Sequence, residues 1–270
     1  MRLYMETENN PVAETEKKCC REERAVGKDA LLIAGAVVLG SLIVAGAVFT
    51  LSPKAAVAPT KDTGSAAQVP AGSDNPADTK ATTSISNSAV LGDKTKVKVA
   101  IVEFSDYECP FCKSFHQTTF DQLKKEFVDT GKAIIVFRNF PLSFHEPNAT
   151  LEAATAECVR KEKGDVAYFA FGKALYQNTQ ANGKGLVAGK LDELIRNAGA
   201  NPKTVNVCAA SDAVKQEIVK DTADGGKAGV QGTPSFVIGT LDGNGTVTGE
   251  RVVGAVPFDT FKTTVEKYLK

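Results

Sequence analysis

Cys109 and Cys112 are separated by Pro110 and Phe111, and this spacing can close a small, reversible disulfide. Proline is favoured at the first position of a helix, so Pro110 predicts that a helix begins at the motif. The sulfur of Cys109 would then lie near the positive end of the helix dipole, which favours thiolate over thiol. We expect Cys109 to exchange with a partner sulfur, and Cys112, one turn further on, to resolve the mixed disulfide.

Two cysteines at this spacing can also form half of a zinc site. Such a site would need two further ligands, and the distant Cys158 and Cys208 do not form a second pair of this kind. The chain has only two histidines, which disfavours a multi-histidine metal site. We therefore favour redox chemistry and expect neither a metal nor another cofactor.

The surrounding pattern alternates strands and helices. β-Branched and apolar residues at 97–104 predict a buried strand before the motif, and apolar residues at helical spacing follow it up to Gly131. Further strands are predicted at 133–140, 233–240 and 246–253, several helices at 148–222, and a last helix at 258–269. The order is β-α-β, a helical insert, then β-β-α.

Two segments resemble a known family. Residues 104–112 (FSDYECPFC) are similar to the active-site segment of the DsbA-like branch of the thioredoxin superfamily, and residues 229–238 (GVQGTPSFVI) to its second signature. The resemblance covers about residues 90–270. It implies an α/β thioredoxin fold, with a helical insert at about 145–224 between the second and third strands. It also implies a cis Thr233–Pro234 bond facing the disulfide, with the Thr233 backbone free to pair with a substrate.

The same resemblance assigns roles to other residues. Glu103 is similar to a buried acid of the family, which could relay a proton for Cys112; a half-exposed strand glutamate is the alternative. Cys158 and Cys208 are similar to cysteines that form a structural disulfide between helices of the insert. The alternative is that they are two buried free thiols. The remaining polar residues are predicted to be structural or peripheral: Asp106 and Glu108 on the loop and rim, His116 structural, His145 on the surface or capping a helix.

The first third of the sequence predicts attachment to a membrane. Residues 30–51 are uncharged and long enough to span a bilayer, and most nearby lysines and arginines precede them. We expect a cytoplasmic tail at 1–29, a single-span anchor at 30–51, a flexible linker at 52–92 and an extracytoplasmic domain at 93–270 in a bacterium. A cleaved signal peptide is the alternative, and Cys19 and Cys20 would be free thiols.

Composition narrows the function further. The formal net charge is zero, so nothing favours nucleic-acid binding. We expect a monomeric thiol–disulfide oxidoreductase whose substrates are thiols of exported proteins and which has a membrane redox partner. The family's strongest oxidants have a histidine where this chain has Phe111. Reductase or isomerase activity therefore stays an alternative to oxidase activity, with a peptide-binding, chaperone-like module as the third.

Overall fold

In the computed structural model, residues 79–270 are described. The predicted tail and anchor, and the linker up to residue 78, lie outside them, as do Cys19 and Cys20. Among residues 79–270, no helix is both long and apolar enough to cross a membrane.

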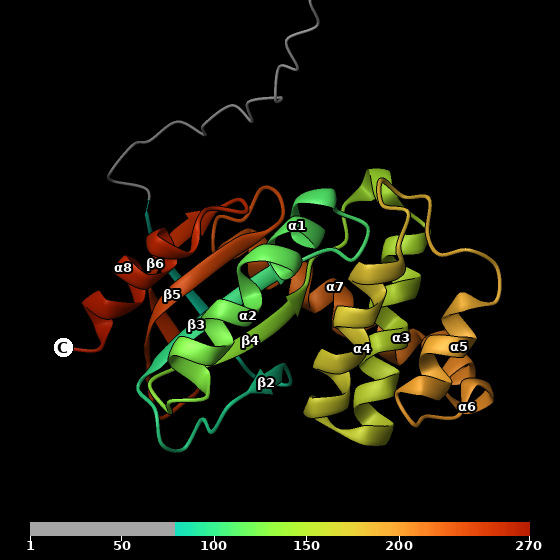
Figure 1. Cartoon of the computed structure of the whole chain (residues 1–270), viewed down its shortest axis with the longest axis horizontal. Coiled ribbons are helices and arrows are strands. Elements are labelled where there is room, and N and C mark those ends of the chain that lie inside the picture. Colours follow the sequence, from blue (N-terminus) through green and yellow to red (C-terminus); the bar gives the residue numbers. More distant parts are fainter. Residues whose placement is uncertain (1–78) are drawn as a thin grey trace, which may run out of the picture. The chain divides into compact units, whose positions relative to one another are not determined.

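A six-stranded sheet in the order β1-β6-β5-β3-β4-β2 forms the centre of the domain (Figure 1). β3 and β4 are parallel, and the other neighbouring strands are antiparallel. The strands are β1 Lys80–Ser84, β2 Ala89–Leu91, β3 Val99–Ser105, β4 Ile134–Asn139, β5 Ser235–Leu241 and β6 Thr246–Val253. β3 and β4 are buried along their whole length, which explains the apolar runs Val99–Val102 and Ile134–Phe137 with which they begin.

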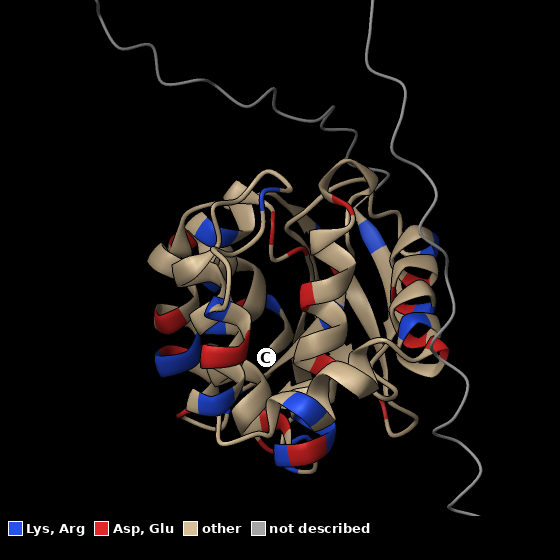
Figure 2. Ribbon diagram, turned by 90° about the vertical axis from the view of Figure 1, so that its right-hand side faces the viewer, with Lys and Arg blue, Asp and Glu red and all other residues tan. Residues whose placement is uncertain are grey.

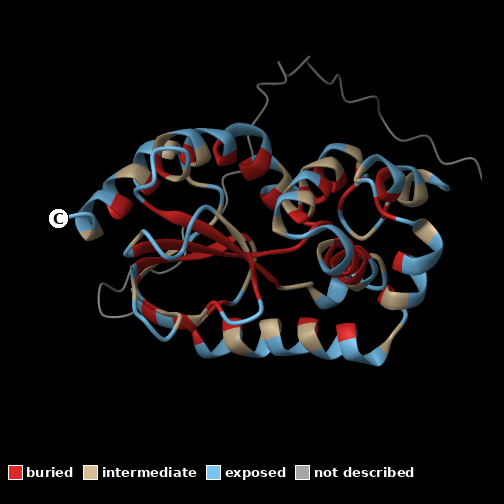
Figure 3. Cartoon of the chain, turned by 90° about the horizontal axis from the view of Figure 1, so that it is seen from below, coloured by how far each residue is buried: buried red, intermediate tan, exposed pale blue. Residues whose placement is uncertain are grey.

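Helices cover both faces of this sheet, as the burial colouring in Figure 3 shows. Alternate residues of β3, such as Ile101 and Val102, point to opposite faces and join different apolar clusters. The face to which Ile101 points packs against α1, α2 and α8. Helix α7 packs against β4 and β1. These helices are α1 Pro110–Thr118, α2 Phe120–Leu123, followed by a π-helical turn at Lys124–Val128, α7 Asp212–Lys227 and α8 Phe258–Tyr268.

The insert between β4 and β5 is helical, as predicted, and has its own apolar core. Tyr107 and Cys112 belong to that same core, so the insert packs directly against the CxxC region. Acidic and basic residues are mixed over the helices (Figure 2). The insert comprises a 3-10 turn at Ser143–His145, α3 Asn148–Lys163, α4 Asp165–Asn178, α5 Lys190–Asn197, α6 Pro202–Ala209 and α7.

The prediction of a linker up to residue 92 is wrong for its last part, because β1 and β2 lie within it. The segment Lys80–Ser84 has few large apolar residues, and its stability comes from pairing with β6 and from the buried side chains of Ala81 and Thr83. Polar strands at a sheet edge give a weak sequence signal, since half of their side chains face solvent.

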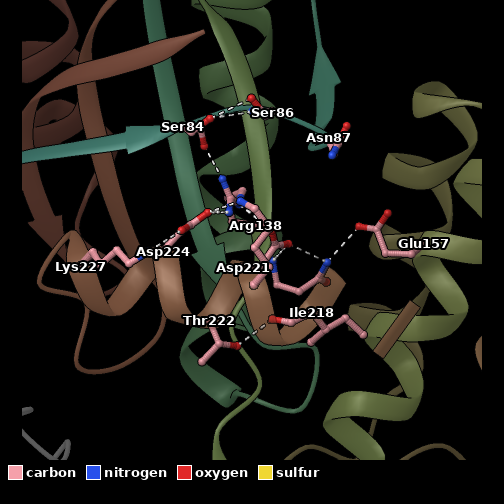
Figure 4. A network of polar contacts seen from close by, with 12 residues as sticks. Ser84, Ser86, Asn87, Arg138, Glu157, Ile218, Asp221, Thr222, Asp224 and Lys227 are labelled. Atoms are coloured by element: carbon pink, nitrogen blue, oxygen red, sulfur yellow. Dashed lines mark hydrogen bonds and ion pairs between the residues drawn. The ribbon is translucent and has the colours of Figure 1, made fainter. Parts of the chain in front are cut away.

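A buried arginine connects β1, at the edge of the sheet, to the rest of the domain. Arg138, in β4, is completely buried; its Nε lies 2.8 Å from Oδ1 of Asp221 and its Nη2 2.8 Å from Oδ2 of Asp224 (Figure 4). Its Nη1 donates to the carbonyl oxygen of Ser84. A buried charge is tolerated only when it is paired, so these contacts hold α7 and the end of β1 against β4.

Candidate active site

The two cysteines of the CxxC motif lie where the predicted helix begins. Cys109 has extended backbone angles and immediately precedes α1, and Cys112 lies in the first turn of that helix. Both are free thiols and both are buried, with 3 % of Cys109 and none of Cys112 exposed. Pro110 occupies the first helical position, where its missing N–H costs no hydrogen bond. The predicted start of the helix at Pro110 is therefore confirmed.

The surroundings of Cys109 favour its thiolate. The pKa of Cys109 is lowered to about 6, first by a hydrogen bond from Cys112, against the opposing effect of burial, and then by the Thr233 side chain and the backbone N–H groups of Cys112 and Phe111. The pKa of Cys112 is raised, chiefly by burial and also by its hydrogen bond to Cys109. The pair therefore has one sulfur ready to react near neutral pH and one that keeps its proton.

This difference predicts the pH dependence of alkylation. The thiolate is the reactive form, so the rate at which iodoacetamide modifies Cys109 should rise with pH to a plateau, with a midpoint near the lowered pKa of about 6. Mass spectrometry of the reduced chain after timed alkylation measures this rate. A Cys112→Ser variant is the control for modification of the second thiol. A midpoint near the value of a free thiol, about 8.5, would contradict the assignment.

The Thr233–Pro234 bond is cis, as the resemblance implied, and faces the active cysteine. The Cys109 sulfur lies 3.3 Å from the carbonyl oxygen of Thr233. The segment before it needs a glycine at 229, where φ is +80° and a Cβ atom would lie 1.9 Å from Nη1 of Arg251. Nη1 of Arg251 instead donates a hydrogen bond to the Gly229 carbonyl oxygen at 2.8 Å. This bond holds the backbone segment that leads to the Thr233–Pro234 bond.

Glu103, in β3, is buried, so the alternative of a half-exposed strand glutamate is wrong. Its Oε1 lies 2.9 Å from Nε2 of His116, on α1. The His116 ring stacks between Phe120 and Tyr176, with centroid distances of 4.6 and 4.2 Å. His116 therefore has the structural position expected of it, and it is the hydrogen-bonding partner of the acid proposed to serve Cys112.

Asp106 and Glu108 were expected on the rim, and that prediction is wrong, because both are buried. Asp106 accepts hydrogen bonds from the backbone N–H of Leu142 and of Glu108, at 2.9 and 2.8 Å. Its Oδ2 also lies 2.7 Å from Nδ1 of His145, which is itself buried rather than on the surface. Buried loop amides need acceptors, and a carboxylate can supply several.

Glu108 likewise accepts hydrogen bonds from the loop that follows α4. Its Oε2 accepts from the backbone N–H of Gly185 at 2.8 Å, its Oε1 accepts from the Thr179 hydroxyl, and its carbonyl oxygen accepts from Asn182 at 2.7 Å. The two acids before Cys109 thus fasten two loops of the insert to the CxxC motif. From the sequence alone, Asp106 and Glu108 were expected to be exposed, because the loops that bury them lie far along the chain.

Three further residues near the site were not singled out from the sequence. Ser105, the last residue of β3, and Tyr176, on α4, are buried and hydrogen-bonded to each other. Glu152, on α3, is also buried, and its pKa is raised to about 9, first by burial and then by the negative charge of Glu108. A serine at a strand end and two residues inside helical patterns have no sequence signature that marks them as parts of this site.

Cys158, on α3, and Cys208, on α6, form the disulfide that the resemblance implied. The bond joins two helices of the insert and closes a segment with a sequence separation of 50 residues. The proposed pairing is therefore present, and it is separate from the free Cys109–Cys112 pair.

Comparisons with known proteins agree with this site. A protein-family profile described as Thioredoxin matches residues 84–257. The disulfide bond formation protein D of Bacillus subtilis is 28 % identical over 69 % of this chain and 79 % of its own length. A putative protein-disulfide oxidoreductase of Rickettsia felis is 32 % identical over 68 % of this chain and 61 % of its own.

Solved structures show the same likeness. The crystal structure of oxidised BdbD from Bacillus subtilis has a TM-score of 0.61 and 27 % sequence identity, and the match covers 71 % of this chain and 98 % of that one. The names of these relatives describe disulfide chemistry. The chain belongs to the thioredoxin family and, within it, to the DsbA-like protein-disulfide oxidoreductases.

Proposed function

We propose that this protein is an oxidase that donates its Cys109–Cys112 disulfide to thiols of exported proteins. The observation that carries the direction is the lowered pKa of Cys109, about 6. A stabilised thiolate favours the reduced pair, and an enzyme with a favoured reduced form gives its disulfide away readily. The B. subtilis relative is named for disulfide bond formation, which supports the same direction.

The electrons move in two exchanges. A substrate thiolate attacks the Cys109 sulfur; the Cys109–Cys112 bond breaks, and its electron pair goes to Cys112, which takes up a proton. A second substrate thiolate then attacks the substrate sulfur of the mixed disulfide, and Cys109 leaves as a thiolate. The substrate loses two electrons and the cysteine pair gains them.

Three other residues have proposed roles in this reaction. The Thr233 backbone, beside Pro234, pairs with the substrate strand next to Cys109; the 3.3 Å approach of the Thr233 carbonyl oxygen to the Cys109 sulfur supports this. Glu103 relays the proton that Cys112 takes up, which its burial and its contact with His116 support. We further propose that residues 30–51 anchor a monomer to the membrane, that the domain formed by residues 79–270 works outside the cytoplasm, and that a membrane protein reoxidises the pair.

Reductase or isomerase activity is the second candidate, and Phe111 favours it. The Phe111 side chain is 48 % exposed beside the active sulfur and has no group that could hydrogen-bond a thiolate. Two assays of the full-length protein separate the directions. Stoichiometric oxidised protein should restore activity to a reduced, unfolded protein that needs disulfides, and the reduced protein should cleave insulin disulfides slowly. The opposite pattern would reject the oxidase.

Phe111→His tests the influence of this position. A histidine here can donate a hydrogen bond to the Cys109 thiolate, or carry a positive charge beside it, so the pKa of Cys109 should fall further. The equilibrium constant with glutathione should shift about tenfold towards the reduced pair, which equals about 30 mV. Phe111→Leu keeps an apolar side chain and is the matched control. Equal potentials in the two variants would show that the side chain at 111 does not tune the pair.

A further inference from the structure

Asp106 begins the turn that leads from β3 into α1 and ends at Cys109. Its carbonyl oxygen accepts a hydrogen bond from the backbone N–H of Cys109 at 3.1 Å, and Oδ1 of its side chain accepts one from the backbone N–H of Glu108 at 2.8 Å. The next bond, from the N–H of Lys113 to the Cys109 carbonyl oxygen at 3.0 Å, already belongs to the start of the helix. The backbone and the side chain of Asp106 therefore both hold the turn that places Cys109.

The second oxygen of the Asp106 carboxylate contacts the helical insert. Oδ2 accepts a hydrogen bond from the backbone N–H of Leu142 at 2.9 Å and lies 2.7 Å from Nδ1 of His145. The backbone N–H of His145 donates to the Leu142 carbonyl oxygen at 2.8 Å, within the 3-10 turn with which the insert begins. One buried side chain thus joins the turn before Cys109 to the first turn of the insert.

The donors around Asp106 match an ionised carboxylate. Backbone N–H groups can only donate, so both oxygens of Asp106 act as acceptors. We assign the proton of the third contact to Nδ1 of His145, which then donates to Oδ2. Each of these buried polar groups has its partner, and the loss of a donor or of an accepting oxygen would leave one unpaired. The turn would then shift to pair it again, because buried polar groups are costly without a hydrogen bond.

The placement of Cys109 matters because its sulfur faces the segment proposed to hold the substrate. Sγ of Cys109 lies 3.3 Å from the carbonyl oxygen of Thr233. Cys109 follows β3, whereas Thr233 lies just before the neighbouring strand β5, so the turn that begins at Asp106 decides how the two groups meet. Reacting groups must be held at the right distance and angle, and a small displacement lowers the rate strongly.

We propose that Asp106 and His145 are positioning residues, which hold the turn before Cys109 so that its sulfur meets a bound substrate in the geometry that exchange requires. The inference rests on the proposed function, since it takes Thr233 as the backbone that pairs with the substrate, and it makes the first turn of the insert part of the active site. Both residues act through the Cys109 backbone. Their loss should therefore slow the reaction of bound substrate and leave substrate binding unchanged.

Variants of the full chain separate this role from a general effect on stability. Asp106→Asn keeps the size of the side chain but replaces an accepting oxygen with an NH₂ group. His145→Leu removes the Nδ1 donor. His145→Asn restores a donor, because the amide nitrogen of asparagine is as many bonds from the backbone as Nδ1 of histidine. Asp165→Asn is the matched control, since Oδ2 of Asp165 also accepts from a backbone N–H, that of Val90 at 3.0 Å, but joins α4 to β2.

The reaction is followed in a single turnover. The reduced Cys109–Cys112 pair of each variant is mixed with increasing concentrations of a peptide that contains a disulfide. The Cys109 thiolate attacks one peptide sulfur, and the other leaves as a thiolate. Cys112 then gives up its proton, attacks the Cys109 sulfur and releases the peptide, so the cysteine pair loses two electrons and the peptide gains them. Mass spectrometry after acid quenching gives the limiting rate and the half-saturating peptide concentration.

Alkylation of the same reduced chains supplies two controls. Iodoacetamide needs no docking beside Thr233, so the plateau of its rate with pH measures the reactivity of the Cys109 thiolate alone. Cys112 is completely buried, so its protection from alkylation shows that a variant is folded.

We expect Asp106→Asn and His145→Leu to lower the limiting rate about tenfold, with the half-saturating concentration and the alkylation plateau close to the wild-type values. His145→Asn should recover most of this loss, and Asp165→Asn should react like the wild type.

An unchanged limiting rate in His145→Leu, or an equal loss in His145→Asn, would overturn the inference even if Asp106→Asn failed to fold. Alkylation of Cys112 in His145→Leu would overturn it as well, because His145 would then serve folding rather than the rate. An equal loss in Asp165→Asn would show that stability alone sets the rate. A wild-type chain that does not react with the peptide disulfide would instead reject the redox function itself.

Discussion

Cys109→Ser should lower the rate of thiol–disulfide exchange to that of the uncatalysed reaction, whereas Cys112→Ser should accumulate disulfide-linked complexes with its substrates. Cys109 carries the thiolate with a pKa of about 6, and the Thr233 carbonyl oxygen faces its sulfur at 3.3 Å, so the mixed disulfide forms there. Cys112 is completely buried and is the group that releases the partner. Non-reducing electrophoresis of the two variants after incubation with a protein that contains non-native disulfides measures both effects, because the Cys109 thiolate attacks such a disulfide and one substrate sulfur leaves as a thiolate.

The Cys109→Ser/Cys112→Ser double variant is the control for complexes formed by other thiols. It keeps the structural disulfide and should form none. Complexes trapped by Cys109→Ser, and not by Cys112→Ser, would reverse the assigned roles of the two cysteines. Full exchange activity in Cys109→Ser would show that Cys109 is not the reacting sulfur.

Removing the second cysteine pair should change stability rather than activity. A cross-link between residues 50 positions apart stabilises the folded state by about 4 kcal/mol in the chain-entropy model, because it restricts the unfolded chain. The Cys158→Ser/Cys208→Ser variant should therefore lose about that free energy of unfolding, and its melting temperature should fall by about 8–16 °C. Thermal and urea unfolding, with the Cys109–Cys112 pair reduced, measure the difference.

The active-site double serine variant is a matched control here too, since under those conditions it also lacks two thiols but loses no cross-link. It should unfold much closer to the wild type. The Cys158→Ser/Cys208→Ser variant, in contrast, should keep its exchange activity below its melting temperature. A melting temperature equal to that of the wild type would show that the bond between α3 and α6 contributes nothing to stability.

Much of the fold was predictable because the relevant signals are local. The buried parallel strands β3 and β4 each begin with an apolar run, and Pro110 marks the start of α1. The position of Pro234 opposite Cys109 followed from the resemblance, since no local pattern reports that two distant segments meet. β1 was missed because an edge strand with the sequence KATTS has almost no apolar face of its own.

The polar part of the site was the least predictable. Asp106, Glu108 and His145 look like surface residues. Only the tertiary structure brings them close to their partners, which are loop backbone N–H groups for the two acids and the Asp106 carboxylate for His145. Tyr176 and Ser105 are 71 positions apart, and each fits an ordinary strand or helix pattern. Hydrogen-bond partners of buried polar residues depend on three-dimensional packing, which spacing along one sequence does not report.

The reduction potential of the Cys109–Cys112 pair tests the proposed oxidase most directly. It is measured by equilibrating the full chain with glutathione buffers of known ratio and separating the reduced and oxidised forms. Because the Cys109 thiolate is stabilised, we predict a potential clearly less negative than that of thioredoxin, which is about −270 mV. A value at or below about −270 mV would contradict the oxidase and favour a reductase.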